Sequence, residues 1–355
     1  MAASAGWIRL STKIPFIVWI LIFASSGYFL PGLYTWNWSG WQPQDAIQPL
    51  VQLIMFGMGI TLTFSDFSRI FKQPRSILIG VICQFVAMPF LAWCFVTLFG
   101  LQGEVAAGLV LIGSCPGGVS SNVICYIAGA NVPLSVTLTA CSTLASPVAT
   151  PLAMKFYAGQ HIEVEFLPMM NSILLMILVP VLLGLIVNRL ASRQVRVLKE
   201  VLPAVAMLSI CLIIAITIAL AGEDLKTVGL ALFAAAVCHN TMGYVLGYGT
   251  AWVAGMPSRD CRTMAIEVGI QNGGMATGLA LHVLKSPLMA LGAAVFGPWS
   301  AVSSSILAAY WQRREPIEPA DATTLLKSAD TPEPQTSNAA SLSVLPVSPE
   351  IHSPS

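Results

Sequence analysis

One acidic residue stands inside an apolar stretch of this sequence. Glu267 occurs in the run Ala-Ile-Glu-Val-Gly-Ile-Gln-Asn-Gly-Gly, whereas the other Asp and Glu residues fall in predicted loops, at the ends of apolar segments or in the C-terminal tail. If that stretch crosses a membrane, its carboxylate costs about 2.5–3.5 kcal/mol to insert and needs a partner. No Lys or Arg lies at a comparable depth, so we expect a bound cation, with a protonated structural glutamate as the alternative.

Two apolar segments contain residues that interrupt a helix. One carries Cys-Pro-Gly-Gly-Val-Ser-Ser-Asn at 115–122, and the other carries Gln-Asn-Gly-Gly at 271–274. Proline removes a backbone donor and glycine weakens a helix, so carbonyl and amide groups are left unpaired. In a membrane such backbone is tolerated only inside the protein or beside a water-filled cavity. Free carbonyls suit a small hard cation and helix N-termini favour an anion, so we predict an ion site at these breaks.

Hydroxyl and amide side chains occur near the predicted breaks. Ser135 and Thr139 are four residues apart and share one face of a predicted helix, and Gln84 lies in another apolar segment. Oxygen ligands alone suit Na⁺ better than a transition metal, which prefers His or Cys. The eight cysteines form no C-x-x-C pair, so the sequence suggests neither a zinc site nor a disulfide framework.

The composition identifies the elements that position these residues. Of 355 residues, 56% are hydrophobic and 9% are charged, with a net charge of +1, whereas soluble domains contain about 25% charged residues. The sequence therefore predicts a polytopic membrane protein, and the lack of a basic surface argues against nucleic-acid binding. With roughly 20 apolar residues per span, we predict ten spans at 14–31, 46–64, 76–99, 104–128, 133–156, 166–188, 201–220, 227–254, 262–284 and 287–311.

A shift of 156 residues relates the two halves of this predicted domain. It carries Gly117-Gly118 onto Gly273-Gly274 and brings the starts of spans one to five close to those of spans six to ten. Because each half has an odd number of spans, the second half enters the membrane from the opposite side, as in many transporters. The expected fold is thus all-α, with two inverted five-helix repeats and broken helices at spans four and nine.

Lysine and arginine orient the predicted spans. With the N-terminus inside, 14 of the 17 basic residues lie on the cytoplasmic side, and Lys155, Lys226 and Lys285 lie outside. We therefore predict that both termini are cytoplasmic. The expected organisation is a cytoplasmic N-terminus at 1–13, a transporter domain at 14–312 and a disordered cytoplasmic tail at 313–355, which is rich in proline and serine.

These motifs resemble the bile acid:sodium symporter family, and closely its bacterial members. The similarity covers about residues 10–312, and the matching stretches are 55–62, the segment around Gln84, 115–122, 128–139, 142–151 and 266–273. The resemblance implies a panel domain of spans one, two, six and seven and a core domain of spans three to five and eight to ten. It also implies that the broken fourth and ninth helices cross in the core, and that the protein lies in a bacterial inner membrane.

The resemblance implies two Na⁺ sites that share one carboxylate. The first would consist of Ser121, Asn122, Ser135, Thr139 and Glu267. The second would consist of Gln84, Glu267, Val268, Ile270 and Gln271. Every side chain that the family pattern requires is present, so we expect Na⁺ as the coupling ion and no cofactor.

Charge and two departures from the family predict the substrate. Two Na⁺ ions and one carboxylate leave a net charge of +1, which a small organic monoanion such as a keto acid or a pantoate-like hydroxy acid would neutralise. Relatives near the bile-acid-transporting type tend to have His-Asn after the tryptophan of the last span and Thr-Ala at the first break, whereas this chain has Ser300-Ala301 and Val119-Ser120. Both departures count against a bile acid. We expect the anion to contact Gly118, Val119, Ser120, Asn272, Gly273 and Ser300.

The expected activity is Na⁺-coupled symport by alternating access, in which ion binding orders the breaks and creates the anion site. A bile-acid-like substrate stays open, as do two other functions on the same scaffold. One is a proton-coupled antiporter, in which Glu267 would carry a proton, and the other is a sensor that binds its ligand without transporting it. An intramembrane enzyme is disfavoured, because the sequence has no H-E-x-x-H, no G-x-S-x-G and no second buried carboxylate.

Overall fold

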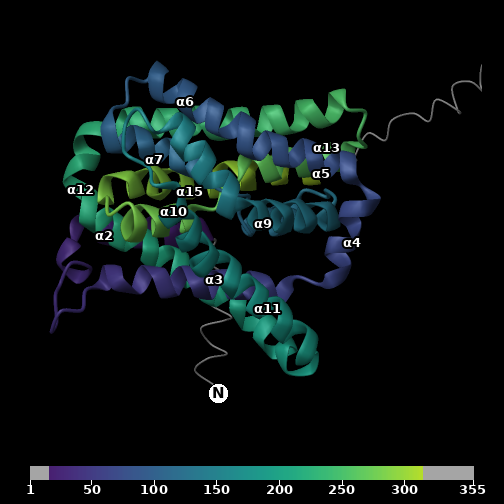
Figure 1. The fold of residues 1–355 in the computed structure, drawn as a ribbon, viewed down its shortest axis with the longest axis horizontal. Coiled ribbons are helices and arrows are strands. Elements are labelled where there is room, and N and C mark those ends of the chain that lie inside the picture. The colour runs from purple at the N-terminus through teal and green to yellow at the C-terminus, as the bar shows by residue number, and fades with distance from the viewer. Residues whose placement is uncertain (1–15, 315–355) are drawn as a thin grey trace, which may run out of the picture. The chain divides into compact units, whose positions relative to one another are not determined.

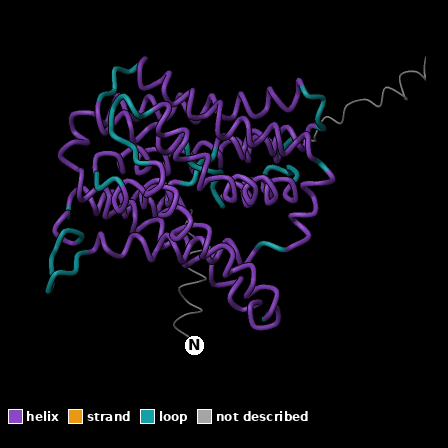
Figure 2. Tube along the Cα trace, in the orientation of Figure 1, coloured by secondary structure: helices purple, strands orange, loops and turns teal. Residues whose placement is uncertain are grey.

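The computed structural model describes residues 16–314, and in that range the chain is helical and contains no β-strand (Figures 1 and 2). The predicted N-terminal segment 1–13 and the predicted tail beyond Arg314 lie outside the described residues. The α-helices are α2 (Phe16–Phe29), α3 (Ile47–Thr61), α4 (Phe64–Lys72), α5 (Pro74–Ile82), α6 (Met88–Leu98), α7 (Gly103–Gly113), α8 (Ser120–Ile127), α9 (Val132–Tyr157), α10 (Phe166–Ile173), α11 (Val179–Leu190), α12 (Ser192–Val253), α13 (Ser258–Gly269), α14 (Gly273–Gly278) and α15 (Pro287–Gln312). Short 3₁₀ or π turns complete the order at η1 (Pro31–Leu33), η2 (Pro43–Ala46), η3 (Cys83–Ala87), η4 (Leu174–Leu178) and η5 (Leu279–Val283).

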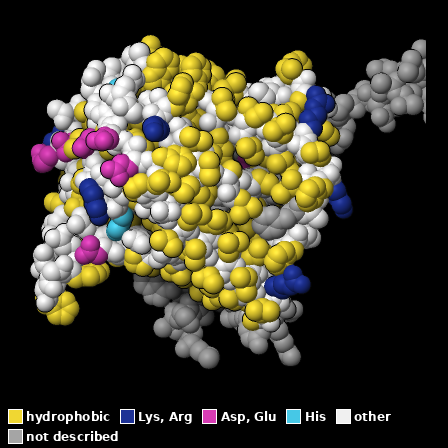
Figure 3. Space-filling model, viewed as in Figure 1, with side chains coloured by type: hydrophobic (Ala, Val, Ile, Leu, Met, Phe, Trp, Pro, Cys, Tyr) yellow, Lys and Arg dark blue, Asp and Glu magenta, His cyan; other side chains and the backbone are white. Residues whose placement is uncertain are grey.

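Several of the described helices are long and apolar enough to cross a membrane. Five pass by length and composition, namely Pro74–Leu98, Val132–Tyr157, Phe166–Leu190, Val201–Val253 and Pro287–Gln312. A sixth is possible if the bent pair Pro43–Thr61 and Phe64–Lys72 forms one span. On the face that Figure 3 shows, hydrophobic side chains cover the middle and charged side chains lie at the two ends. The chain is therefore an all-helical polytopic membrane protein, while its division into ten spans stays a prediction.

Helix α12 covers the predicted spans 201–220 and 227–254 and differs from the prediction only in the segment between them. The sequence predicts a loop at 221–226, whereas the structure has two helices that meet at a kink, with non-helical backbone angles at Ala221 (φ −123°, ψ 19°). The following polar turn stays helical because it lacks proline and because Lys226 pairs with Glu223 three residues before it, at 2.7 Å. At 1.5 Å per residue, the apolar part of α12 is about 80 Å long, more than twice the hydrocarbon thickness of a bilayer. It therefore has room for two spans.

Helix α4 is a second difference, because the sequence predicts a loop in this segment. The helix is bent by 75° from the preceding helices. It starts with a cap at Thr63, whose backbone N–H donates to the Asp66 carboxylate at 2.8 Å and whose hydroxyl donates to the same oxygen at 2.7 Å. A helix of nine residues is too short for a search that requires about 20 apolar residues.

The two interrupted helices lie at the centre of the fold. Every residue of α7 from Val105 to Gly113 is buried, and so is every residue of α13 from Asp260 to Gly269. The helices around them pack closely through glycine. A Cβ atom on Gly59 of α3 would collide with the Val181 carbonyl of α11, and one on Gly184 of α11 would collide with the Phe56 carbonyl of α3. The α3–α11 pair therefore depends on backbone contact that no larger residue permits.

Replacing Gly184 by alanine should destabilise the protein. The added methyl group overlaps the α3 backbone, and overpacking of this kind costs about 1–3 kcal/mol. Thermal unfolding of the purified protein should show a lower Tm for Gly184→Ala. Gly249→Ala is the matched control, because a Cβ atom there meets no atom within 4 Å. An unchanged Tm for Gly184→Ala would contradict the packing described here.

Candidate functional site

The two predicted helix breaks lie against each other. The segment between α7 and α8 pairs with the segment between α13 and α14 in an antiparallel manner. The backbone N–H of Gly118 donates to the carbonyl of Ile270 at 3.1 Å, and the N–H of Asn272 donates to the carbonyl of Pro116 at 3.0 Å. Groups at helix ends lack partners within their own helix. Each break therefore satisfies backbone groups of the other.

Glycine is required at the first break because the second break approaches so closely. A Cβ atom on Gly118 would lie 2.8 Å from the carbonyl oxygen of Gln271. A Cβ atom on Gly117 would lie 2.8 Å from Oε2 of Glu267. Neither glycine has a positive φ, so the need is for space rather than for an unusual backbone conformation. The Gly-Gly pair thus brings the first break against the buried carboxylate.

The carboxylate of Glu267 is surrounded by hydroxyl groups from two helices, α8 and α9. Its side chain is 4% exposed. Ser121 of α8 donates to Oε1 at 2.5 Å, Ser135 of α9 donates to the same oxygen, and Thr139 lies 3.1 Å from Oε1 and 3.0 Å from Oε2. Asn122 is part of the same cluster, since its Oδ1 lies 2.8 Å from the Ser135 hydroxyl oxygen. The structure thus brings together all five residues of the predicted first site.

No basic side chain neutralises this carboxylate within residues 16–314, where the ion pair found joins Lys226 to Glu223 at the surface. Each hydroxyl group has one proton and two lone pairs. Thr139 can give its proton to the Ser135 carbonyl in its own helix, 3.0 Å away, which leaves its lone pairs beside the carboxylate. The oxygen atoms of this cluster can therefore act as ligands, and an oxygen-only set suits a hard cation.

A second cluster adjoins Glu267. The side-chain amide of Gln84 donates to Oε1 of Gln271 at 2.5 Å and to the Cys115 carbonyl at 2.6 Å, and that of Gln271 donates to the Val268 carbonyl at 2.8 Å. A cavity of about 10 Å³ is lined by Gly80, Val81, Gln84, Leu138, Ser142, Glu267 and Val268. This volume is close to what one water-sized particle requires. Four residues of the predicted second site belong to this cluster, namely Gln84, Glu267, Val268 and Gln271. The fifth, Ile270, lies apart from it, and its carbonyl accepts a hydrogen bond from the first break.

Ser142 belongs to the second cluster, although the sequence analysis did not select it. Its Oγ accepts from the backbone N–H of Gly117 at 3.4 Å and lines the small cavity beside Glu267. A signal was present in the sequence, because Ser142 follows Thr139 by three residues and so shares its helix face.

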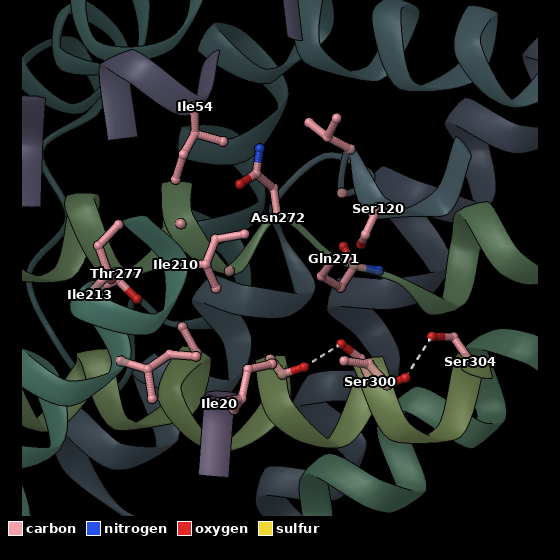
Figure 4. A pocket seen from close by; sticks show the side chains of 18 of the residues that line it. Ile20, Ile54, Ser120, Ile210, Ile213, Gln271, Asn272, Thr277, Ser300 and Ser304 are labelled. Carbon is pink, nitrogen blue, oxygen red and sulfur yellow. Dashed lines mark hydrogen bonds between the residues drawn. The ribbon is translucent and has the colours of Figure 1, made fainter. Parts of the chain in front are cut away.

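A larger cavity of about 160 Å³ lies beside the breaks (Figure 4). All six residues predicted to contact the anion line it, namely Gly118, Val119, Ser120, Asn272, Gly273 and Ser300. Its apolar wall includes Ile54 of α3 and Ile210 and Ile213 of α12, and further hydroxyl groups come from Thr277 and Ser304. Sequence reasoning missed this apolar wall, because an isoleucine that faces a cavity has the same local pattern as one that faces lipid.

The comparisons with known proteins match one family. The sodium bile acid symporter family matches residues 48–228, which include the first break and the hydroxyl residues that follow it. An uncharacterized sodium-dependent transporter of Bacillus subtilis (strain 168) is 37% identical over 299 residues, 84% of this chain and 91% of that protein. A probable chloroplastic sodium/metabolite cotransporter of Arabidopsis thaliana is 32% identical over 306 residues, 86% of this chain and 75% of that protein. An ileal sodium/bile acid cotransporter of Oryctolagus cuniculus is 30% identical over 227 residues, 63% of this chain and 65% of that protein.

Na⁺ should stabilise the folded protein through the Glu267 cluster. A ligand at 100 times its Kd adds about 2.7 kcal/mol to the free energy of unfolding, so Tm should be higher in NaCl than in choline chloride. Thr139→Val keeps the shape of the side chain but removes one oxygen, and should reduce this Na⁺-dependent increase. Thr217→Val is the control, because Thr217 is equally buried but bonds only to the Ile213 carbonyl of its own helix. An equal Na⁺ effect in both variants would exclude Thr139 from the site.

Proposed function

The chain belongs to the sodium bile acid symporter family, and from that premise we propose that it carries a small organic monoanion together with Na⁺ by alternating access. The matched family and the relatives above are named as sodium symporters, sodium-dependent transporters or cotransporters. The protein is therefore a sodium-coupled membrane transporter and not an enzyme. The identity of the substrate, the ion sites and the conformational change are what we propose.

The observation that carries the proposal is the buried Glu267 carboxylate, which is enclosed by hydroxyl oxygens and lacks a basic partner among the described residues. A cation at this point would offset the cost of the buried charge. We assign the first Na⁺ to the cluster of Ser121, Asn122, Ser135, Thr139 and Glu267. We assign the second to the cluster of Gln84, Glu267, Val268, Ile270 and Gln271, beside the 10 Å³ cavity.

The larger cavity is the proposed substrate site. Two Na⁺ ions and one carboxylate leave one positive charge beside it, which favours a monoanion. The substrate carboxylate would contact the backbone amides near Val119 and Gly273, at the starts of α8 and α14. The isoleucine wall favours a short hydrocarbon part, and the volume of about 160 Å³ favours a keto or hydroxy acid over a steroid. The name sodium/bile acid cotransporter describes the Oryctolagus cuniculus relative, and we do not carry its substrate over to this chain.

The inverted repeat and the division into panel and core are also part of the proposal. Two features support the repeat. Asn131 caps the first turn of α9, where its Oδ1 accepts from Leu134 N–H at 3.1 Å, and Ser286 caps α15 in the same way at 3.1 Å from Met289. Both helices contain 26 residues and start 155 residues apart. We propose that the protein lies in a bacterial plasma membrane. The distribution of basic residues in the sequence supports an orientation in which both termini are cytoplasmic.

The proposed mechanism couples the ions to the substrate through the second break. Gln271 both bonds to Gln84 beside the small cavity and lines the larger one. Na⁺ at Glu267 would hold the two breaks in this arrangement and complete the anion site. The affinity for substrate should therefore rise with Na⁺, and the affinity for Na⁺ should rise equally with substrate. Movement of the core against the panel would then expose the cavity to the other side.

Na⁺-driven uptake of labelled monocarboxylates into proteoliposomes tests this function. Uptake should require an inward Na⁺ gradient and should proceed without a proton gradient. Glu267→Gln should reduce it to the level of empty vesicles, because the neutral amide no longer attracts the cation, while the protein still inserts into the membrane. Glu223→Gln is the control, since that carboxylate is exposed and pairs only with Lys226.

The alternative functions give different results in the same vesicles. Equal uptake with choline in place of Na⁺, or normal uptake by Glu267→Gln, would overturn the proposed ion site. Uptake that follows a proton gradient instead of a Na⁺ gradient would indicate the antiporter. Saturable binding without uptake would indicate the sensor.

A further inference from the structure

A hydrogen-bonded cluster behind the second break connects it to the wall of the larger cavity. We propose that Asn240, Ser303 and Tyr244 are positioning residues that transmit the state of the ion-site break to the α15 wall of the substrate cavity. The inference rests on the proposed Na⁺-coupled symport, and it concerns residues that line neither the small cavity nor the larger one.

The cluster begins at the last residue of α13. Gly269 lies two residues after Glu267, and its carbonyl is one of those that a helix end leaves without a partner in the same helix. The side-chain amide of Asn240 donates to this carbonyl at 2.9 Å. Asn240 is fully buried in α12, the helix that precedes α13 in the chain. Its amide therefore holds the end of the helix that carries the proposed cation ligand.

The same asparagine also holds α15. Its Oδ1 accepts a hydrogen bond from the hydroxyl of Ser303 at 2.6 Å, and Ser303 lies 2.9 Å from the hydroxyl of Tyr244. Three residues before Ser303 on the same helix is Ser300, which lines the cavity (Figure 4). The carbonyl oxygen of Ser300 lies 3.2 Å from the Ser303 hydroxyl oxygen and accepts from the Tyr244 hydroxyl at 3.5 Å. A displacement of Gly269 would therefore reach Ser300 through two side chains.

Close packing makes this connection stiff. A Cβ atom on Gly269 would collide with the ring of Tyr244, and one on Gly243 would lie 3.0 Å from the Cα atom of Gly269. The second part of α12 therefore touches the end of α13 by backbone and ring contact. Packed groups of this kind shift between discrete arrangements rather than deform continuously, so the cluster can pass on a movement of the break.

The corresponding position in the first half has a different task. A shift of 156 residues carries Gln84 onto Asn240, and both amides donate to a carbonyl that follows or ends an interrupted helix. Gln84 donates to Cys115 and reaches Gln271 beside the ion cluster, whereas Asn240 reaches Ser303 on the cavity wall. The two buried amides thus fix the two breaks, one toward the ions and the other toward the substrate.

The test measures how accessible the cavity wall is to a thiol reagent, with Na⁺ as the only ligand added. Ala301 lines the cavity next to Ser300, so Ala301→Cys reports accessibility through its rate of reaction with a small methanethiosulfonate reagent in proteoliposomes. We expect the rate in NaCl to differ from that in choline chloride by about fivefold or more, within the usual range of coupling between sites. Adding Ser303→Ala should reduce this difference to less than about twofold, while Ser303→Thr, which keeps the hydroxyl group, should restore it.

Two controls separate coupling from a general loss of structure. Ser209→Ala removes a buried hydroxyl that bonds only to the Val205 carbonyl of its own helix, and should leave the Na⁺ response unchanged. Ser303→Ala should keep the Na⁺-dependent rise in Tm, because Ser303 does not contact the Glu267 cluster. Loss of that rise in Ser303→Ala would show that the residue supports the ion site itself, and would overturn the coupling role.

The remaining outcomes distinguish this inference from the proposed function. A Na⁺ response that survives in Ser303→Ala, or a parent Ala301→Cys protein that does not respond to Na⁺ although Na⁺-driven uptake is intact, overturns the inference and leaves the symport standing. Uptake by the unmodified protein that does not depend on Na⁺ overturns the proposed function and the inference with it. Labelling of the unmodified chain measures the contribution of its own cysteines.

Discussion

The backbone of the two interrupted helices must find hydrogen-bond partners inside a protein that is surrounded by lipid. Water is absent from the hydrocarbon region, so an unpaired carbonyl or N–H group there is costly. The structure meets this constraint by setting the two breaks against each other, with hydrogen bonds from Gly118 to Ile270 and from Asn272 to Pro116. Two buried amides, Gln84 and Asn240, bond to further carbonyls beside the breaks. Residues 117 and 118 must be glycines because the second break and Glu267 approach the first break so closely.

This arrangement also explains how the proposed ion site and the proposed anion site would share a few residues. Glu267 lies against the first break because Gly117 leaves room for its carboxylate. The hydroxyl groups of α8 and α9 surround this carboxylate. Gln271, four residues later, lies between the small cavity and the larger one. A cation that fixes this segment, as proposed, would therefore act on the proposed substrate cavity over a short distance.

Local properties of the sequence predicted much of the fold and of the site. The apolar segments, the two Gly-Gly breaks and the isolated Glu267 can each be recognised within a short window, and the described helices lie close to the predicted spans. The same windows failed where a helix is short. They left α4 as a loop because nine residues are fewer than a span needs, and in α12 they predicted a loop at 221–226 where the chain is helical again directly after the kink at Ala221.

The sequence by itself determined that the chain is a helical membrane protein with one carboxylate inside an apolar stretch, between two helix breaks, because hydrophobicity, charge and helix breaking act over a few neighbouring residues. Only the tertiary structure decided what those breaks touch. The isoleucine wall of the cavity joins α2, α3 and α12, and Asn240 meets Gly269 and Ser303 from separate helices. Such contacts depend on how whole helices pack, and packing is set by shape and close approach over long sequence separations, which no local pattern records.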